Sequence, residues 1–559
     1  MSNSIAFTLN EQGDELARKL MLQTTQRFSK ATLKENWIPN SAIILIMAVP
    51  AAIRLIAPLI DDKENDPSVV AIDSTGTFVT PLLGAHKVAN QLAREIAATL
   101  GATAVISTAS DSSNTPALDA YKGYCSLGNV AHAITLMNNG IHPRILNPQK
   151  HLIPLTLAKG ESDGSLEILI SQNSSLIDDF LISNAPTTRV VLVPKDIVLG
   201  VGCSSYATYD ELESLLKSSL SNANLNKHSI LGIATIDSRK DHPAILGLGY
   251  EITSYPADTL SQVPTPNPSA VVESFMQTAS VSEAAAILLS GSPSLLAEKA
   301  KSETATIAIA KKSKPGRIFV VGLGPGDLSL ISPLAMRTIG SMDAIIGFSQ
   351  YIEYVKQLIN PNQLVEPSPI GYEKGRVQRA IQLGNDGYSV AILSSGDPGI
   401  YALASLLYEM KPSLDPAVTI EVIPGITAAL SSASLLGAPL GHDHCYISLS
   451  DLLTPWQSIE TKVSAAAKGD FVTVFYNPKS KNRDWQLDAA IKTLAEYRPV
   501  ECPVGIVRNA YRESQQITMM TLGDFDSESV DMNCIVFVGS SMSYISNDKI
   551  ITPRGYRLE

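Results

Sequence analysis

Short apolar runs alternate with amphipathic stretches along most of the chain, most clearly in its second half. There, residues 318–321, 389–393 and 418–423 are short and almost wholly apolar, which predicts buried strands. A loop rich in Gly and Pro follows each run, and a helical pattern follows each loop. This order is typical of a parallel α/β sheet, in which ligands lie beyond the carboxyl ends of the strands. We therefore expect the three loops to meet at one ligand site.

The loop after the first of these strands argues against a dinucleotide site. It reads Gly-Leu-Gly-Pro-Gly over residues 322–326, so its third glycine comes one position too early for the fingerprint G-x-G-x-x-G. Asp343 has about the right separation for the ribose-binding acid, but it precedes the strand predicted at 344–348. A nicotinamide or flavin site is therefore disfavoured. Ser332, which is followed by a proline, predicts the start of the next helix.

The first half of the chain alternates strands and helices less regularly. At 559 residues the chain exceeds the roughly 250 to 300 residues that one core supports, so several domains are expected. We predict α/β domains at 1–115, 196–311, 317–440 and 441–559, a middle region at 116–195 and a linker at 312–316. Within the first domain we predict helices at 13–24 and 89–100 and strands at 69–72 and 105–107. The middle region has strand-like sequence at 155–170 but no assignable chemistry.

Charge and composition limit the classes of partner and compartment. The formal net charge is −11 and no run rich in Lys or Arg occurs, which argues against nucleic-acid binding. Five scattered cysteines without a C-x-x-C pair suit free thiols in a reducing compartment. The start of the chain has no apolar signal core. The apolar stretch 41–60 contains Arg54, and a charge at mid-span costs about 2.5 to 3.5 kcal/mol. A strand at 42–48 and a helix at 51–59 explain it better, so we expect a cytoplasmic protein with no membrane segment.

The three loops resemble those of the tetrapyrrole methylases, and later motifs narrow the resemblance. Phe-Tyr-Asn-Pro-Lys-Ser-Lys-Asn-Arg at 475–483, with the segments 394–401 and 505–510, is similar to the precorrin-3B C(17)-methyltransferase family. The similarity runs from residue 315 to about residue 540. It implies the two-domain class III methyltransferase fold, S-adenosyl-L-methionine as methyl donor, a precorrin or cobalt-precorrin substrate, and a homodimer. Methyl transfer to carbon 17 with ring contraction would be the reaction; a methylase acting on another tetrapyrrole carbon is the alternative.

The same resemblance implies a set of site residues. The donor's sulfonium makes its methyl group an electrophile, so positioning can supply the catalysis and no metal is expected. The carboxylates of the substrate would call for cations, although a solvated surface position is the stronger interpretation for each of them. Asp397 could contact the cofactor or bond only the backbone of its own turn. Expected cofactor contacts are Gly324, Pro325, Gly326, Ser395, Gly396, Asp397, Ile400, Thr427, Ala428 and Tyr476, and expected substrate contacts are Lys479, Arg483 and Arg508.

No catalytic acid or base is assigned from the sequence, although Arg508 and His86 are candidates. His86 precedes a predicted helix, where it could bond the backbone or reach a ligand at a strand-to-helix switch. Residues 200–205, a glycine-rich turn after a predicted strand, could hold an anion with backbone N–H groups. Cys203 within that turn could be a nucleophile, but a buried structural thiol is the stronger interpretation.

The first 311 residues resemble the cobalt-precorrin-5A hydrolase family, whose members open a lactone and release acetaldehyde. The match lies in residues 53–70, 200–203, 234–237 and 282–286. The chain has Ser204-Ser205 where the family tends to have arginines. Without these arginines, the chain lacks two charge-assisted hydrogen-bond donors to the carboxylates of the substrate. Hydrolase activity and a non-catalytic role in passing intermediate are therefore both open for this half.

Overall fold

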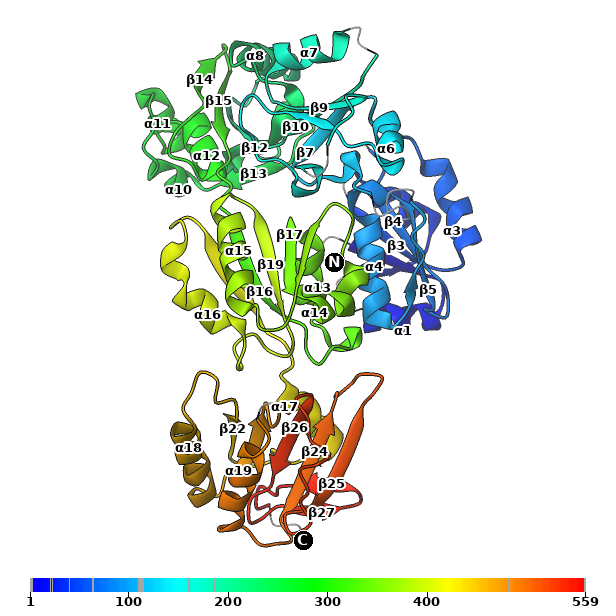
Figure 1. The fold of residues 1–559 in the computed structure, drawn as a ribbon. Helices are drawn as coiled ribbons and strands as arrows, with labels where there is room; N and C mark the ends of the chain where they lie inside the picture. Colours follow the sequence, from blue (N-terminus) through cyan, green and yellow to red (C-terminus); the bar gives the residue numbers. More distant parts are fainter. Residues whose placement is uncertain are drawn as a thin grey trace.

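The computed structural model describes residues 4–20, 22, 24–39, 41–62, 65–108, 115–158, 161–183, 186–480 and 483–556, and covers only the backbone at residues 86, 87, 158 and 271. The strands of these residues form six sheets with helices between them. In Figure 1, the sheet that opens the second half stands at the centre, with the amino-terminal sheet beside it and the last sheet below. The chain is therefore an assembly of several α/β units, as the sequence predicts.

The amino-terminal sheet has the strand order β2-β1-β3-β4-β5-β6. Its central strands are wholly buried, as expected for parallel strands covered on both faces. The predicted helix at 13–24 ends at residue 19, and residues 24–27 form an edge strand instead. The strand predicted at 105–107 lies at residues 103–104. The elements are β1 Ser4–Thr8, α1 Glu11–Lys19, β2 Thr24–Arg27, α2 Lys30–Glu35, β3 Ala42–Ile46, α3 Val49–Ile56, β4 Ser68–Ile72, β5 Phe78–Leu83, η2 Ala85–Ala89, α4 Asn90–Leu100 and β6 Thr103–Ala104.

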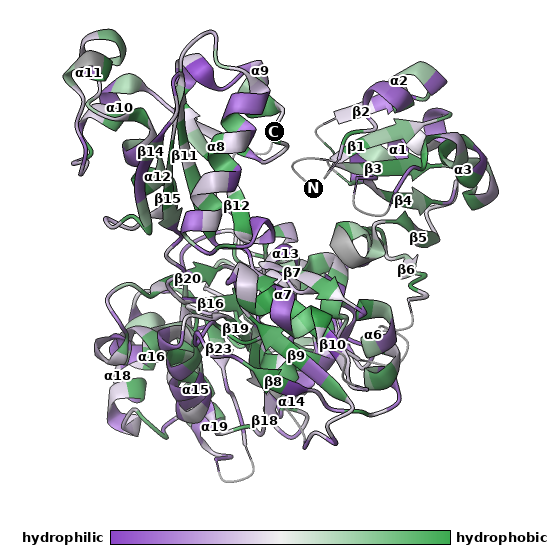
Figure 2. Ribbon diagram, turned by 90° about the horizontal axis from the view of Figure 1, so that it is seen from above, coloured by the Kyte–Doolittle hydropathy of each residue, from purple (hydrophilic) through white to green (hydrophobic). Residues whose placement is uncertain are grey.

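The middle region forms a sheet of its own, in the order β7-β10-β9-β8. The strand-like sequence at 155–170 divides into a 3-10 turn, η4, and a strand. Figure 2 shows the strands β8, β9 and β10 of this sheet as largely hydrophobic, which fits their place in a core. The elements are η3 Leu118–Ala120, β7 Tyr124–Gly128, α6 Val130–Asn138, β8 Arg144–Leu146, η4 Leu155–Ala158, β9 Leu166–Ile170, α7 Ser174–Ile182 and β10 Thr188–Pro194.

The third sheet, β13-β12-β11-β15-β14, completes the first half. Helix α12 packs against its central strand β11, where a Cβ atom at Gly200 would lie 1.8 Å from the carbonyl oxygen of Ser282. Glycine at this position thus lets helix and strand backbones meet. The elements are β11 Ile197–Cys203, α8 Tyr209–Asn222, β12 Ile230–Ile236, α9 Pro243–Leu246, β13 Ile252–Tyr255, α10 Ala257–Ser261, α11 Ala270–Met276, α12 Val281–Ser290, β14 Ala297–Lys301 and β15 Ala305–Lys311.

The fourth sheet is wholly parallel, in the order β18-β17-β19-β16-β20. The three apolar runs predicted as buried strands are its neighbours β19, β16 and β20. The prediction of burial is wrong for β20, because this strand lies at the edge of the sheet and only Ile423 of its residues is buried. Ser332 caps the next helix by accepting a hydrogen bond from the Ala335 N–H, as predicted. The elements are β16 Arg317–Gly322, α13 Pro333–Ser341, β17 Ala344–Phe348, α14 Ser349–Val355, β18 Leu364–Ser368, α15 Glu373–Asn385, β19 Ser389–Ser394, α16 Leu403–Glu409, β20 Thr419–Ile423 and α17 Ala428–Leu436.

The last large sheet, β22-β23-β26-β24-β25, mixes parallel and antiparallel pairs. A small sheet joins residues 437–438 to the carboxy-terminal hairpin, across the boundary predicted at 440. The domain boundaries themselves stay predictions. The elements are β21 Gly437–Ala438, β22 His444–Ser448, α18 Trp456–Lys468, β23 Val472–Tyr476, α19 Gln486–Ala495, β24 Pro503–Arg508, β25 Gln516–Thr521, β26 Cys534–Val538, β27 Tyr544–Ser546 and β28 Lys549–Ile551.

Candidate functional site

The loops after β16, β19 and β20 are packed backbone against backbone. Gly324 and Gly396 exchange two hydrogen bonds, with N–H to oxygen distances of 3.2 and 2.8 Å. Both glycines have a φ of 65°, a left-handed conformation that side-chain-bearing residues rarely adopt. A Cβ atom at Gly425 would lie only 2.2 Å from the carbonyl oxygen of Gly396. The three loops therefore meet at one edge of the sheet, as the sequence predicts.

Asp397 braces two of these loops. Its Oδ1 atom accepts a hydrogen bond from the Gly399 N–H at 2.8 Å, within its own turn. Its Oδ2 atom accepts one from the Gly425 N–H at 3.1 Å, in the loop after β20. Because both oxygens bond backbone, Asp397 makes the turn contact left open by the sequence and also joins a second loop. Its predicted contact with the cofactor stays a prediction.

Tyr476, at the end of β23, connects the last sheet to the third loop. Its hydroxyl lies 2.5 Å from the Thr427 hydroxyl and accepts a hydrogen bond from the Ala429 N–H at 2.9 Å. Burial raises the pKa of the Tyr476 phenol, so it remains neutral and available for these bonds. Ile400 and Ala428 pack against the apolar cluster that includes Tyr476. Residues from both sheets thus surround the same loops.

Arg512 also reaches these loops from the last sheet, and the sequence did not identify it. It lies in the loop between β24 and β25, and its Nε atom donates to the Pro325 carbonyl at 2.7 Å. Its Nη2 atom lies 3.5 Å from the Ser395 hydroxyl, and its guanidinium lies 5.0 Å from the ring centroid of Tyr354. The motif quoted at 505–510 ends two residues before it, so a longer segment would have included this arginine.

The cations predicted to bind substrate are engaged with the protein itself. Lys479 donates to the carbonyl and hydroxyl oxygens of Ser527, both at 2.8 Å. Arg483 is buried and donates through Nη1 to the carbonyl oxygens of Leu449, Asn477 and Pro478. Arg508 forms an ion pair with Asp531, with 2.7 Å between Nη2 and Oδ2, and it keeps two-fifths of its side chain exposed. Substrate binding by these residues stays a prediction.

In the first half, the predicted anion cradle at residues 200–205 is not present. Gly200 and Gly202 lie inside β11, paired with β15, so their backbone belongs to the sheet. Burial raises the pKa of the Cys203 thiol to about 11, which keeps it protonated near neutral pH. This fits a structural cysteine better than a nucleophile. The backbone of His86 lies in η2, but its side chain lies outside the described residues.

Comparison with known proteins agrees with this geometry. The second half is an α/β unit whose glycine loops are contacted from two sheets. Residues 317–526 match the sequence profile of the Tetrapyrrole (Corrin/Porphyrin) Methylases. In the first half, residues 31–111 match the Cobalamin synthesis G N-terminal profile and residues 197–310 the Cobalamin synthesis G C-terminus profile.

Among relatives, the chain is 42% identical over 241 residues to a probable cobalt-factor III C(17)-methyltransferase of Salmonella typhimurium, matching 43% of this chain and 100% of that protein. It is 42% identical over 246 residues to a cobalt-factor III methyltransferase of Priestia megaterium, matching 43% of this chain and 45% of that protein. The crystal structure of the methyltransferase CobJ is 33% identical, covers 43% of this chain and all of its own, and has a TM-score of 0.40. The chain belongs to the tetrapyrrole methylase family.

Among the residues that the structure describes, no helix combines the length and the apolar character that crossing a bilayer requires. The apolar stretch at 41–60 instead forms β3, α3 and a 3-10 turn, η1 Ala57–Leu59, as the sequence predicts.

Proposed function

We propose that the chain transfers a methyl group from S-adenosyl-L-methionine to carbon 17 of precorrin-3B or cobalt-factor III, with contraction of the macrocycle. The observation that carries this is the convergence of the three glycine loops, braced by Asp397, at the carboxyl edge of the β16 sheet. The second half of the chain matches a probable cobalt-factor III C(17)-methyltransferase over the whole length of that protein, which supports the choice of substrate. The chain would act in the cytoplasm and as a homodimer, both inferred from the sequence.

The site suits a sulfonium donor. Left-handed glycines leave the loop backbone free of side chains, so a cofactor could approach it closely. The cofactor would supply a methyl group attached to positively charged sulfur; the ring carbon would take the methyl group while the electrons of the C–S bond return to sulfur. Asp397 and Tyr476 would fix the loops, and Ile400 and Ala428 would supply apolar contacts. These residues would thus contribute to catalysis by holding the methyl donor and the ring carbon in line.

We further propose that the first half opens the lactone formed on the contracted macrocycle and releases acetaldehyde. The two Cobalamin synthesis G profiles support this activity. Ser204 and Ser205 stand where arginines are expected, but Arg239 lies close by and donates from Nε to the Cys203 carbonyl at 3.0 Å. A guanidinium therefore remains at this strand end. The alternative is a first half that only holds and passes the intermediate.

The test supplies the full-length protein with methyl-labelled S-adenosyl-L-methionine and either cobalt-factor III or precorrin-3B. We expect S-adenosylhomocysteine and a product heavier by one methyl group, placed on carbon 17 by NMR. A methyl group on another carbon would favour the alternative methylase, and no turnover with either substrate would refute the proposal. Acetaldehyde released when the same protein is given cobalt-precorrin-5A, the substrate of the hydrolase family that the first half resembles, would distinguish lactone opening from a purely carrying role.

A further inference from the structure

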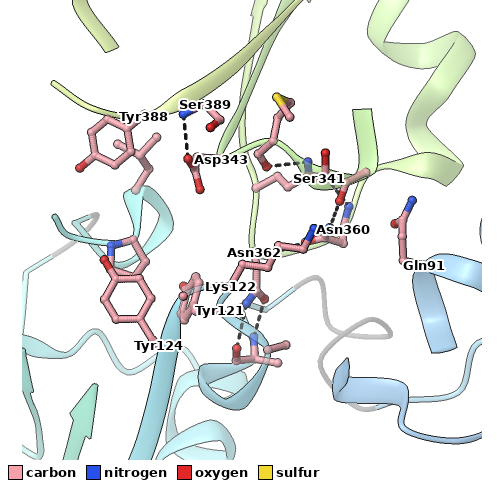
Figure 3. A pocket seen from close by; sticks show the side chains of 18 of the residues that line it. Gln91, Tyr121, Lys122, Tyr124, Ser341, Asp343, Asn360, Asn362, Tyr388 and Ser389 are labelled. Atoms are coloured by element: carbon pink, nitrogen blue, oxygen red, sulfur yellow. Dashed lines mark hydrogen bonds between the residues drawn. The ribbon is translucent and has the colours of Figure 1, made fainter. Parts of the chain in front are cut away.

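A second candidate site lies where the two halves of the chain meet. A cavity of about 860 Å³ is bounded by α4, by residues 119–124, by the linker and by the amino ends of β16, β17 and β19 (Figure 3). The glycine loops follow the carboxyl ends of β16 and β19. Since a strand of this length spans about 20 Å at roughly 3.3 Å per residue, the cavity and the glycine loops lie at opposite edges of the sheet.

The cavity is basic although the chain as a whole is acidic. Its described lining includes five cationic side chains and two carboxylates, a net charge of +3, against −11 for the whole chain. The cations come from four segments: the helix α4, the middle region, the linker and β16. Such a concentration of one sign in a concave site attracts ligands of the opposite charge. The cations are Arg94, Lys122, Lys312, Lys314 and Arg317, and the carboxylates are Asp119 and Asp343.

Two of these cations come from different segments, Lys122 from the middle region and Lys314 from the linker. A Cβ atom at Gly123 would lie 3.0 Å from Nζ of Lys314, so the linker lysine reaches the middle region. Lys122 is exposed, yet the neighbouring protein atoms lower the pKa of its ammonium, while burial raises the pKa of Asp343. An anion close to Lys122 would favour the charged form of this lysine.

Two tyrosine rings line the cavity, and hydrogen bonds hold them in place. The Tyr388 hydroxyl, from the methylase half, donates to the Ile153 carbonyl at 2.9 Å. The Tyr124 hydroxyl donates to the neighbouring Leu152 carbonyl. In Figure 3, the rings of Tyr124 and Tyr388 stand on the same side of the cavity, with Lys122 beside them. With both hydroxyls bound to backbone, the rings are held in place and present apolar surface to a ligand.

We propose that this junction cavity binds a carboxylate-rich tetrapyrrole, separately from the site of methyl transfer. Its volume lies within the range of about 300 to 1,000 Å³ that is usual for ligand sites. Cations match the peripheral carboxylates of such a ligand, and the tyrosine rings match its flat macrocycle. The inference rests on the proposed function for the identity of the ligand. It gives the two halves a shared place to hold an intermediate.

The experiment titrates the full-length protein with uroporphyrin III, an octacarboxylate whose fluorescence reports binding. We expect two binding events, of which one weakens at least tenfold in the double variant Lys122→Gln, Lys314→Gln. The charge-retaining Lys122→Arg should bind like the unaltered protein, as should Lys492→Gln, which removes an exposed lysine on α19. Uroporphyrin octamethyl ester, which lacks the charges, should not occupy the site. Melting curves show whether the double variant remains folded.

Hydrogen exchange then locates the ligand. Slower exchange at residues 119–124 and 312–317 would support the proposal, whether one or two molecules bind. Protection confined to residues 322–326, 394–401 and 423–428, or a double variant with unchanged affinities, would overturn it. Displacement of uroporphyrin by ATP at equal concentration would also overturn it, since the cavity would then be a phosphate site. The unaltered protein could release no S-adenosylhomocysteine from S-adenosyl-L-methionine and cobalt-factor III or precorrin-3B, while uroporphyrin still slows hydrogen exchange at the cavity. That result would refute the proposed function but not the cavity proposal.

Discussion

Single side chains connect the two sheets that surround the glycine loops. Arg512 and Tyr476 both come from the last sheet, yet their polar atoms bond residues that follow strands of the preceding sheet. A hydrogen bond from a charged donor contributes roughly 1.5 to 3 kcal/mol. At this scale, the position of the last sheet relative to the loops depends on a small number of identifiable contacts.

Replacing Arg512 with lysine tests its role as a positioning residue. Lysine keeps the charge but loses the planar fork that reaches Pro325 and Ser395 together. We expect the KM for S-adenosyl-L-methionine to rise about tenfold, the equivalent of about 1.4 kcal/mol, with a smaller change in kcat. Steady-state kinetics measure both values. The matched control is Arg144→Lys, on an exposed residue of β8, and an Arg512 variant that behaves like this control would contradict the prediction.

The Cys203 thiol gives a pH-dependent prediction. Its pKa of about 11 is raised by burial, so the folded state resists ionisation that the unfolded chain undergoes near its ordinary pKa of about 8.5. The associated stability is complete below about pH 8.5 and is lost as the pH rises through about 11. At pH 8 we expect iodoacetamide to alkylate Cys203 about a hundredfold more slowly in the native than in the unfolded protein. Peptide mass spectrometry measures both rates, and equal rates would refute the assignment.

At the scale of elements, the glycine loops act as one unit. Each follows a parallel strand, and the loops touch through backbone atoms that leave no room for side chains. Asp397 adds a bond between the second and third loops. Adding atoms to a closely packed interior forces the backbone and side chains to shift, which lowers the free energy of unfolding by about 1 to 3 kcal/mol. The geometry of the three loops therefore depends on keeping the strand ends in register.

Gly425→Ala should disturb this unit. Its methyl group would meet the Gly396 carbonyl at 2.2 Å, and backbone on both sides would have to shift. We expect a loss of about 1 to 3 kcal/mol in the free energy of unfolding and at least a tenfold weaker affinity for S-adenosyl-L-methionine. Denaturant titration and calorimetry measure the two effects. Gly399→Ala is the control, because its added Cβ would meet only the Asp397 side chain at 3.2 Å; similar losses in both variants would argue against loop contact as the cause.

At the scale of the whole molecule, the two halves are docked through specific polar contacts. Asn362 accepts a hydrogen bond from the Ala117 N–H and donates one to the Ala117 carbonyl, both at 2.9 Å. Tyr388 adds its bond to Ile153, and α4 packs beside α13, where a Cβ at Gly340 would meet the Gln91 side chain. These contacts enclose the junction cavity and fix the orientation of the first half.

Asn362→Leu removes both bonds across this junction. We expect the unpaired Ala117 groups to weaken docking by about 1 to 3 kcal/mol and limited proteolysis at the linker, residues 312–316, to become several-fold faster. Methyl transfer should change little, because the glycine loops lie at the other edge of the sheet. Asn385→Leu, whose bonds to Ser413 and Asp415 stay within the methylase half, is the control. Equal cleavage of the two variants would show that Asn362 does not hold the halves together.

Local sequence determined the class of the fold and the meeting of the three loops. Apolar strands, helix caps such as Ser332 and glycine-rich turns are encoded within a few residues, so their pattern predicts them. The strand at 24–27 was missed because its polar residues carry no apolar alternation. Only the tertiary structure decided the partners of Lys479, Arg483 and Arg512 and created the junction cavity. Those contacts join residues far apart in the chain, and no local pattern specifies which distant surface a side chain will meet.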